Sequence, residues 1–198
     1  LLAMDEYQCD LGIASEGSFG PHPSIFMAHA DDEFLIFIDK KNNLEIIVRE
    51  LSLDTNFNAA TVSSFQNLVD LVKTVGFPEH GVILKITSEE LPTVVKGIQS
   101  WELLEESFHM LSADNSQVVA ETDMRAMYNP TRMKVIEKAT QKLVEKIKSL
   151  CPQCHVPGFG VVNIKSGLPC EWCGSPTNST KSHIYKCQKC NFEQENMF

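Results

Sequence analysis

Residues 151–190 read CPQCHVPGFGVVNIKSGLPCEWCGSPTNSTKSHIYKCQKC. This stretch contains three Cys-x-x-Cys pairs, which are Cys151/Cys154, Cys170/Cys173 and Cys187/Cys190. Two thiolates three positions apart bind one metal ion from a tight turn, and two such turns complete the tetrahedral sulfur shell that Zn²⁺ prefers. Because the tail has few large apolar side chains, we expect metal binding to supply its folding free energy. The sequence therefore predicts a small zinc-ribbon module over residues 150–198, with structural zinc as its cofactor.

The spacing of the three pairs leaves their pairing open. Joining the first pair to the second encloses 15 residues, whereas joining the second to the third encloses 13. We favour the second pairing, because residues 182–186 (SHIYK) can form a strand that leads into the last turn. A catalytic zinc is not expected, because four thiolates leave no open coordination position.

Composition and charge narrow the classes of partner and compartment. The chain has 198 residues, 43% of them hydrophobic, and no apolar run approaches the ~20 residues that span a bilayer, so no membrane partner is expected. Six of the seven cysteines lie in pairs with metal-ligand spacing, which favours metal binding in a reducing compartment and predicts a cytoplasmic protein. The formal net charge of the chain is −9, with −10 in residues 1–150 and +1 in residues 151–198, and this acidic body disfavours extended nucleic-acid binding.

Residues 1–149 alternate between strand and helix patterns and predict an α/β body, a mixed sheet with flanking helices. We expect strands at 11–14, 34–39, 44–48, 82–86, 94–96 and 118–120. We expect helices that begin after Ser63 or Ser64, after Ser100, and at Pro130 behind an Asn129 cap. The last of these should bury Met133, Ile136, Leu143 and Ile147 and end at Leu150, which places a domain boundary near residue 150.

A glycine-rich segment at 15–23 (SEGSFGPHP) follows the first expected strand and predicts a shaped loop. Its glycines let backbone N–H groups approach a ligand, and Ser15 and Ser18 add hydroxyl groups. Glu16 is the candidate catalytic residue, because a carboxylate there can hold Mg²⁺ or activate water. The alternative is a structural turn with a solvated glutamate.

A second cluster spans residues 121–132 (ETDMRAMYNPTR) and contains two of the three arginines of the chain. An arginine fork beside a helix N-terminus suits a phosphate or a carboxylate. We therefore expect an anion or substrate site that includes Asp123, Arg125, Asn129 and Arg132. The alternative is an internal Asp123–Arg125 ion pair combined with ordinary capping of the helix.

These motifs together resemble an uncharacterised bacterial family that ends in a zinc ribbon. The resemblance is carried by residues 10–23, 121–144 and 151–190. It implies that full-length members begin before Leu1 and continue past Phe198 to a fourth cysteine pair, which would complete a second metal site. It implies no assigned activity.

The segment Ala14–Ser18 also resembles the acidic loop of the inosine/xanthosine triphosphate pyrophosphatase superfamily, and Thr131-Arg132 is similar to the Thr-Arg helix start of one of its branches. The N-terminal phosphate-binding loop of that superfamily is absent from this chain. The likeness implies a metal-dependent hydrolase of nucleoside triphosphates, with Glu16 at the metal or at water. The competing hypothesis is a non-catalytic module that binds a small anionic ligand or a protein, with the ribbon as a docking surface.

Overall fold

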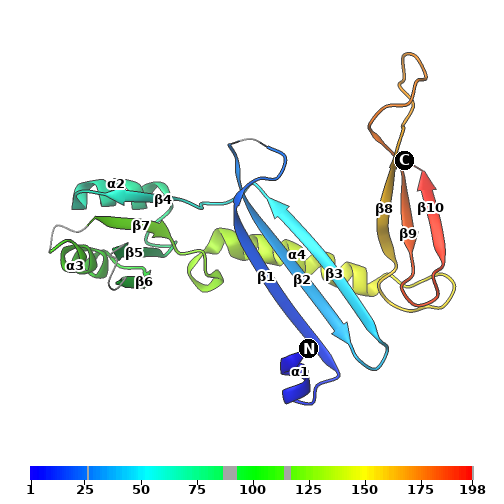
Figure 1. The fold of residues 1–198 in the computed structure, drawn as a ribbon, viewed down its shortest axis with the longest axis horizontal. Helices are drawn as coiled ribbons and strands as arrows, with labels where there is room; N and C mark the ends of the chain where they lie inside the picture. Colours follow the sequence, from blue (N-terminus) through cyan, green and yellow to red (C-terminus); the bar gives the residue numbers. More distant parts are fainter. Residues whose placement is uncertain (26, 87–92, 114–116, 198) are drawn as a thin grey trace. The chain divides into compact units, whose positions relative to one another are not determined.

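The computed structural model of the chain describes residues 1–25, 27–86, 93–113 and 117–197 (Figure 1). Its helices are α1 (Leu2–Glu6), α2 (Phe65–Thr74), α3 (Trp101–Ser112) and α4 (Pro130–Lys148), with a 3₁₀ turn η1 at Ala126–Tyr128. Its first strands are β1 (Leu11–Pro21), β2 (His29–Asp39), β3 (Leu44–Ser52), β4 (Ala59–Val62) and β5 (Val82–Ile86). The remaining strands are β6 (Val94–Ile98), β7 (Val118–Thr122), β8 (Gly160–Ser166), β9 (Thr180–Lys186) and β10 (Glu193–Met197).

Within these residues the strands form three sheets, with the orders β1-β2-β3, β4-β7-β5-β6 and β10-β9-β8. The pairs β4/β7, β5/β7, β5/β6, β8/β9 and β9/β10 are antiparallel. The chain divides into two compact units. Residues 1–16, 34–49 and 139–198 form unit 1, and residues 17–33 and 50–138 form unit 2.

The core of unit 2 lies between the four-stranded sheet and the helices α2 and α3. Both helices begin at serine caps, because the Ser64 and Ser100 hydroxyls each accept a backbone N–H three residues on, at 3.2 Å. Apolar residues of both helices and all four strands form one buried cluster, which includes Val62, Leu68, Val72, Leu84, Ile98, Leu104, Phe108, Val118 and Ala120.

The opposite face of this sheet carries both apolar and charged side chains. The register places Ala59 and Ile83 on either side of Glu121, one residue along from the pairs that face the core. Because strand side chains alternate between faces, this row points away from the helices. Lys85 forms an ion pair with Glu121. One face of the sheet therefore supplies the core and the other can line a binding site.

Unit 1 packs the β2–β3 hairpin against the C-terminal half of α4. Leu35, Leu44, Ile46 and Val48 of the hairpin share a buried cluster with Ala139 and Leu143 of the helix. Lys146 Nζ donates a hydrogen bond to the Ile47 carbonyl at 3.0 Å. Gly158 has φ of +92°, and a Cβ there would lie 3.0 Å from the Ile46 side chain, so glycine allows a close approach to the hairpin.

Most of the predicted elements are confirmed, including the hairpin and the serine-capped helices. Two expectations were wrong. Residues 15–21 continue strand β1 instead of forming a loop. In α4, Leu143 is buried and Ile147 packs against the same cluster as predicted, whereas Met133 is 49% exposed and Val135 and Ala139 are buried instead.

The mixture of helices and sheets that the sequence predicts is present. The proposed domain division at residue 149 stays a prediction, because unit 1 groups residues 139–198 with two earlier segments. In the described part of the chain, no helix has both the length and the apolar character needed to cross a bilayer.

Truncation of the unit 2 core should be costly. Leu104 is fully buried in α3, whereas its neighbour Leu103 is 40% exposed. We expect Leu104→Ala to lower the free energy of unfolding by about 2–5 kcal/mol, because it leaves a cavity, and Leu103→Ala to lower it by under about 1 kcal/mol. Denaturant unfolding followed by circular dichroism measures both. Equal losses would contradict the packing described for α3.

Candidate metal centre and buried polar cluster

The three Cys-x-x-Cys pairs adopt the same backbone turn. In each pair, the backbone N–H of the first cysteine donates to the carbonyl of the residue five positions later. The carbonyl of the same cysteine accepts the N–H of the residue four positions later, and all these bonds are 2.8–3.0 Å long. The residue after the second cysteine has positive φ in every case, and these residues are His155, Gly174 and Asn191. The pattern turns both sulfurs of a pair toward one point. The local sequence has therefore built three equivalent turns of a kind that can bind a metal ion.

Strand pairing decides which turns meet. Strand β8 leaves the first turn and β9 leads into the third, and their antiparallel register places Gly160 opposite Lys186 (Figure 1). The first and third turns therefore lie at the same end of this hairpin. The second turn lies in the connection at the other end, beyond the Ser166–Thr180 pair. Seven residues of strand separate the two ends by roughly 20 Å.

Cys151, Cys154, Cys187 and Cys190 consequently form one cluster, with all four sulfurs within 4.8 Å of one another. The Cys151–Cys190 and Cys154–Cys187 sulfur pairs are each 3.6 Å apart. A tetrahedral zinc with Zn–S bonds of about 2.3 Å requires sulfur separations of about 3.8 Å. The donor set and its geometry therefore fit a tetrahedral thiophilic metal ion.

The surroundings of this cluster are apolar. Cys151 and Cys187 are buried, and Phe159, Tyr185 and Phe192 pack around them. Burial raises the pKa of the Cys151 thiol, but hydrogen bonds from the Cys154 and Gln153 backbone outweigh it and lower that pKa to about 7. One thiol is thus poised to ionise. Four thiolates together need the positive charge of a metal ion.

The pairing that the sequence favoured, Cys170/Cys173 with Cys187/Cys190, is wrong in this structure, and so is the alternative it weighed. Cys170 and Cys173 stand outside the four-sulfur cluster. Hydrogen bonds from Ser175 lower the pKa of the Cys173 thiol. Trp172, between the two cysteines, is 96% exposed. The second turn therefore lies apart from the four-sulfur cluster, in the connection between β8 and β9.

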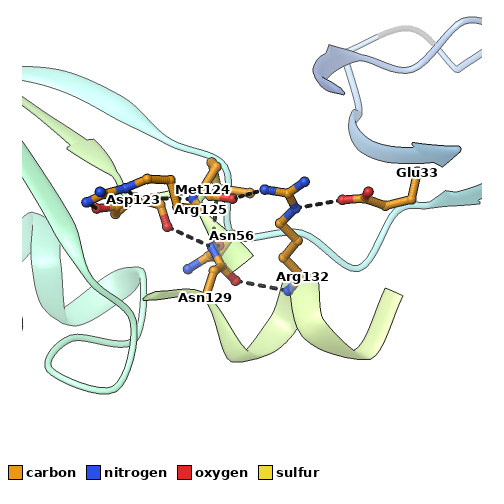
Figure 2. Close-up of polar contacts among 7 residues, drawn as sticks. All are labelled: Glu33, Asn56, Asp123, Met124, Arg125, Asn129 and Arg132. Carbon is orange, nitrogen blue, oxygen red and sulfur yellow. Dashed lines mark hydrogen bonds and ion pairs between the residues drawn. The ribbon is translucent and has the colours of Figure 1, made fainter. Parts of the chain in front are cut away.

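A second group of polar residues lies in unit 2, where two arginines meet buried carboxylates (Figure 2). The side chain of Asp123 has no exposed surface. Arg125 donates two hydrogen bonds to its carboxylate, from Nε at 2.9 Å and from a terminal nitrogen at 2.6 Å. The Gly97 N–H also donates to Asp123, at 3.0 Å. Burial raises the pKa of Asp123, but the bonds from Arg125 outweigh it and hold that pKa below its usual value.

Asn129 and Arg132 connect the start of α4 to this group (Figure 2). The Asn129 amide oxygen accepts the Arg132 N–H at 3.0 Å, which confirms the predicted helix cap. The Arg132 side chain donates to Glu33 Oε1 at 2.6 Å and to the Met124 carbonyl at 2.6 Å. Its guanidinium also stands 4.9 Å from the centre of the Phe19 ring.

Both arginines line a pocket of about 400 Å³ in unit 2. Its other lining residues include Phe19, Phe57, Lys96, Glu121 and Asp123. The Phe19 and Phe57 rings stack with centroids 6.4 Å apart and an interplanar angle of 22°. The pocket therefore combines cationic side chains, two acids and an aromatic wall, and its lining includes Ala59, Ile83 and Glu121 from the sheet face that points away from the helices.

Comparison with known protein families identifies one match, which covers residues 1–198 and is described as a domain of unknown function, DUF6671. The chain belongs to the DUF6671 family. No curated protein and no solved structure matches it.

Apart from the cysteines, the structure places the predicted site residues of this DUF6671 chain in two groups. Asp123, Arg125, Asn129 and Arg132 come together, as the sequence predicts, but both arginines are held in ion pairs with buried acids. Ser15, Glu16 and Ser18 are exposed on strand β1. Because Gly17 faces Glu33 and Arg132, strand alternation puts Glu16 and Ser18 on the other side of β1 from Gly17. Their catalytic or binding roles stay predictions.

Sequence reasoning overlooked Asp31 and Glu33. Both are at most 1% exposed, and three of their four carboxylate oxygens have no hydrogen-bond partner. Burial raises the pKa of Asp31 to about 7, and the negative charge of Glu33 adds to the rise. The sequence did contain a signal for this pair. Asp31 and Glu33 are two positions apart, directly before the apolar strand residues 34–38 (FLIFI), and this spacing puts both acids on one face of the strand.

The raised pKa of Asp31 predicts a pH-dependent stability. In the unfolded chain this carboxyl ionises near pH 4, whereas in the folded chain it keeps its proton to about pH 7. Relative to Asp31→Asn, the wild-type free energy of unfolding should fall as the pH rises from about 4 to about 7, by up to about 1.4 kcal/mol per pH unit, and then level off. Denaturant unfolding in buffer without added divalent cations measures it, and parallel curves would contradict the raised pKa.

Proposed function

We propose that this protein carries a structural zinc ion at Cys151, Cys154, Cys187 and Cys190. The observation that carries the proposal is the convergence of four sulfurs from two equivalent turns within 4.8 Å. Thiolates favour soft or borderline metal ions, and a closed tetrahedral sulfur shell is typical of structural zinc. Such an ion holds the ends of β8, β9 and β10 together, which is the role of a zinc ribbon.

A zinc site of this kind also supports the cytoplasmic placement that the sequence predicts. Thiolate ligands persist where the compartment keeps cysteines reduced. The exposed Trp172 at the hairpin tip supports a protein partner for the ribbon, because a large aromatic side chain in full contact with water is a typical anchor at protein interfaces.

The zinc assignment predicts one tightly held ion per chain. Cys187→Ser should abolish it, because three thiolates and a serine leave the shell incomplete, whereas the matched variant Cys173→Ser should keep it. Elemental analysis after dialysis measures the zinc, and hydrogen exchange of β8–β10 should rise only in Cys187→Ser. Loss of zinc in Cys173→Ser with retention in Cys187→Ser would restore a pairing through the second turn.

A second function is supported by the pocket of unit 2. We propose that it binds a small anionic ligand of the nucleotide class. Its volume of about 400 Å³ is in the range of small-molecule sites. Lys96, Arg125 and Arg132 supply positive charge for phosphate oxygens, and Phe19 and Phe57 supply an aromatic wall against which a base can stack.

Metal-assisted hydrolysis of a nucleoside triphosphate, in the manner of the pyrophosphatase superfamily, is the finer form of this proposal. In that form Mg²⁺ neutralises phosphate charge and Glu16 positions metal or water. Glu16 is exposed and lies on the other side of β1 from Gly17, which faces Arg132. This position supports ligand binding without hydrolysis, because it points Glu16 away from the arginine. The hydrolase stays the alternative.

Binding and hydrolysis can be separated with inosine and xanthosine triphosphates in the presence of Mg²⁺. Titration calorimetry should detect binding, and Lys96→Ala should weaken it about tenfold, the loss of one charge-assisted contact, while the tail variant Lys181→Ala should not. Pyrophosphate release that is abolished by Glu16→Gln would establish the hydrolase. Absence of binding by these triphosphates and by inorganic phosphate would remove the anion-binding proposal.

A further inference from the structure

Three carboxylate oxygens of the buried acids Asp31 and Glu33 have no hydrogen-bond partner among the described residues while both acids are ionised, and a protonated Asp31 can donate to Glu33. These oxygens are Oδ1 and Oδ2 of Asp31 and Oε2 of Glu33. The fourth oxygen, Oε1 of Glu33, accepts the bond from Arg132. Leaving charged oxygens buried without a partner costs several kcal/mol, so their environment must contain a further positive group or a proton.

Charge counting leads to the same requirement. Arg132 supplies one positive charge against two carboxylates, and Asp32, the adjacent acid on β2, adds to the negative potential at Asp31. One negative charge of the buried pair is therefore left uncompensated. A bound cation or a proton shared between Asp31 and Glu33 would each remove it.

The number of unpartnered oxygens distinguishes these two solutions. A shared proton joins one oxygen of Asp31 to one of Glu33 and leaves the second oxygen of Asp31 buried without a partner. A divalent cation can take both oxygens of Asp31 and Oε2 of Glu33, since carboxylates bind such ions with one or two oxygens. The cation thus satisfies all three oxygens, and the proton only two.

We propose that Asp31 and Glu33 form a binding site for an oxygen-preferring divalent cation of the Mg²⁺, Mn²⁺ or Ca²⁺ class. Arg132 acts as a positioning residue, because it fixes Oε1 of Glu33 and leaves Oε2 turned to the ion. Gly17 is part of the site wall, where a Cβ would lie 2.4 Å from Arg132 and 2.5 Å from Glu33 Oε1. Arg132 also lines the pocket, so the cation site adjoins it.

This site is distinct from the four-thiolate site in both chemistry and residues. Carboxylates favour hard cations, whereas thiolates favour zinc. The cation site also does not depend on the nucleotide proposal, because its ligands are satisfied by the ion alone. A pocket that binds no nucleotide would leave the cation site intact, and the two proposals can fail separately.

The test uses the full chain with zinc bound and Mn²⁺ as the probe. Electron paramagnetic resonance of free Mn²⁺ at pH 8 should show one bound ion per chain, displaced by excess Mg²⁺ or Ca²⁺. Asp31→Asn and Glu33→Gln should each weaken Mn²⁺ binding at least about tenfold, because each removes a ligand charge while keeping side-chain shape. The control Asp32→Asn removes the same charge from the opposite strand face and should weaken it less.

Gly17→Ala provides a second test that leaves both carboxylates in place. The added methyl group should displace Glu33 or Arg132 and weaken Mn²⁺ binding, with circular dichroism confirming that the variant is folded. In the wild type, Mn²⁺ affinity should rise as the pH increases through about 7, as Asp31 loses its proton beside Glu33, Asp32 and Arg132.

Three outcomes would overturn the proposal. The first is the absence of Mn²⁺ binding by the wild type at pH 8 up to millimolar concentration. The second is binding that Asp31→Asn and Glu33→Gln leave unchanged. The third is a stability that depends on pH through Asp31 with no response to Mn²⁺, which would assign a shared proton to this pair.

Discussion

Buried negative charge must be balanced by positive charge close by, and both candidate sites of this chain are built around that requirement. In unit 1 the charge is that of cysteine thiolates, which become acceptable in an apolar setting only when a metal ion joins them. In unit 2 it is that of Asp31, Glu33 and Asp123, all at most 1% exposed. Two of the three arginines of the chain, Arg125 and Arg132, pair with two of these acids, Asp123 and Glu33.

The arginines illustrate how one residue type serves structure before function. Each guanidinium holds a buried carboxylate with charge-assisted bonds of 2.6 Å, and removal of either arginine would leave that carboxylate without compensation. At the same time both arginines line the pocket. A ligand anion would therefore meet guanidiniums that are already oriented, which lowers the entropy lost on binding. Internal pairing and ligand binding are compatible when the fork retains further donors, and arginine has five.

Local structure was predictable from the sequence wherever a short-range rule applied. Ser64, Ser100 and Asn129 cap helices because their side chains meet N–H groups three residues on, which is a local event. The pairing of the cysteine turns was not predictable from loop length. Closing a loop of 32 residues instead of 13 costs only about 0.8 kcal/mol more entropy, which is less than strand pairing contributes. The register of β8 with β9 decides the pairing, and the spacing of cysteines does not contain it.

Only part of the site in unit 2 could be predicted from the sequence, because the rest depends on contacts between residues far apart in the chain. The cluster at 121–132 is contiguous in the chain, so its arginines and acids could be read together. Glu33 and Gly17 reach Arg132 through strand positions 99 and 115 residues away, and no periodicity links them. The glycines at 15–23 suggested a loop, yet Gly17 lies in strand β1, at a position where a larger residue would collide with the Glu33–Arg132 pair. A glycine in a strand can thus indicate close approach of a polar group as well as a turn.

The two sites also divide their cations by chemistry. Zinc bound by four thiolates gains little from carboxylate oxygens, and a Mg²⁺-like ion gains little from sulfur. In a protein with both donor sets, the ligand chemistry alone can therefore select a different metal ion at each site. A closed shell of four thiolates leaves an ion no open position, which suits the structural role that we propose. The carboxylate site supplies only two residues, so an ion there retains positions for water or for the phosphate of a ligand in the adjoining pocket. That difference in open positions favours the structural role that we propose for the thiolate site and a ligand-binding role for the carboxylate site that we propose in unit 2.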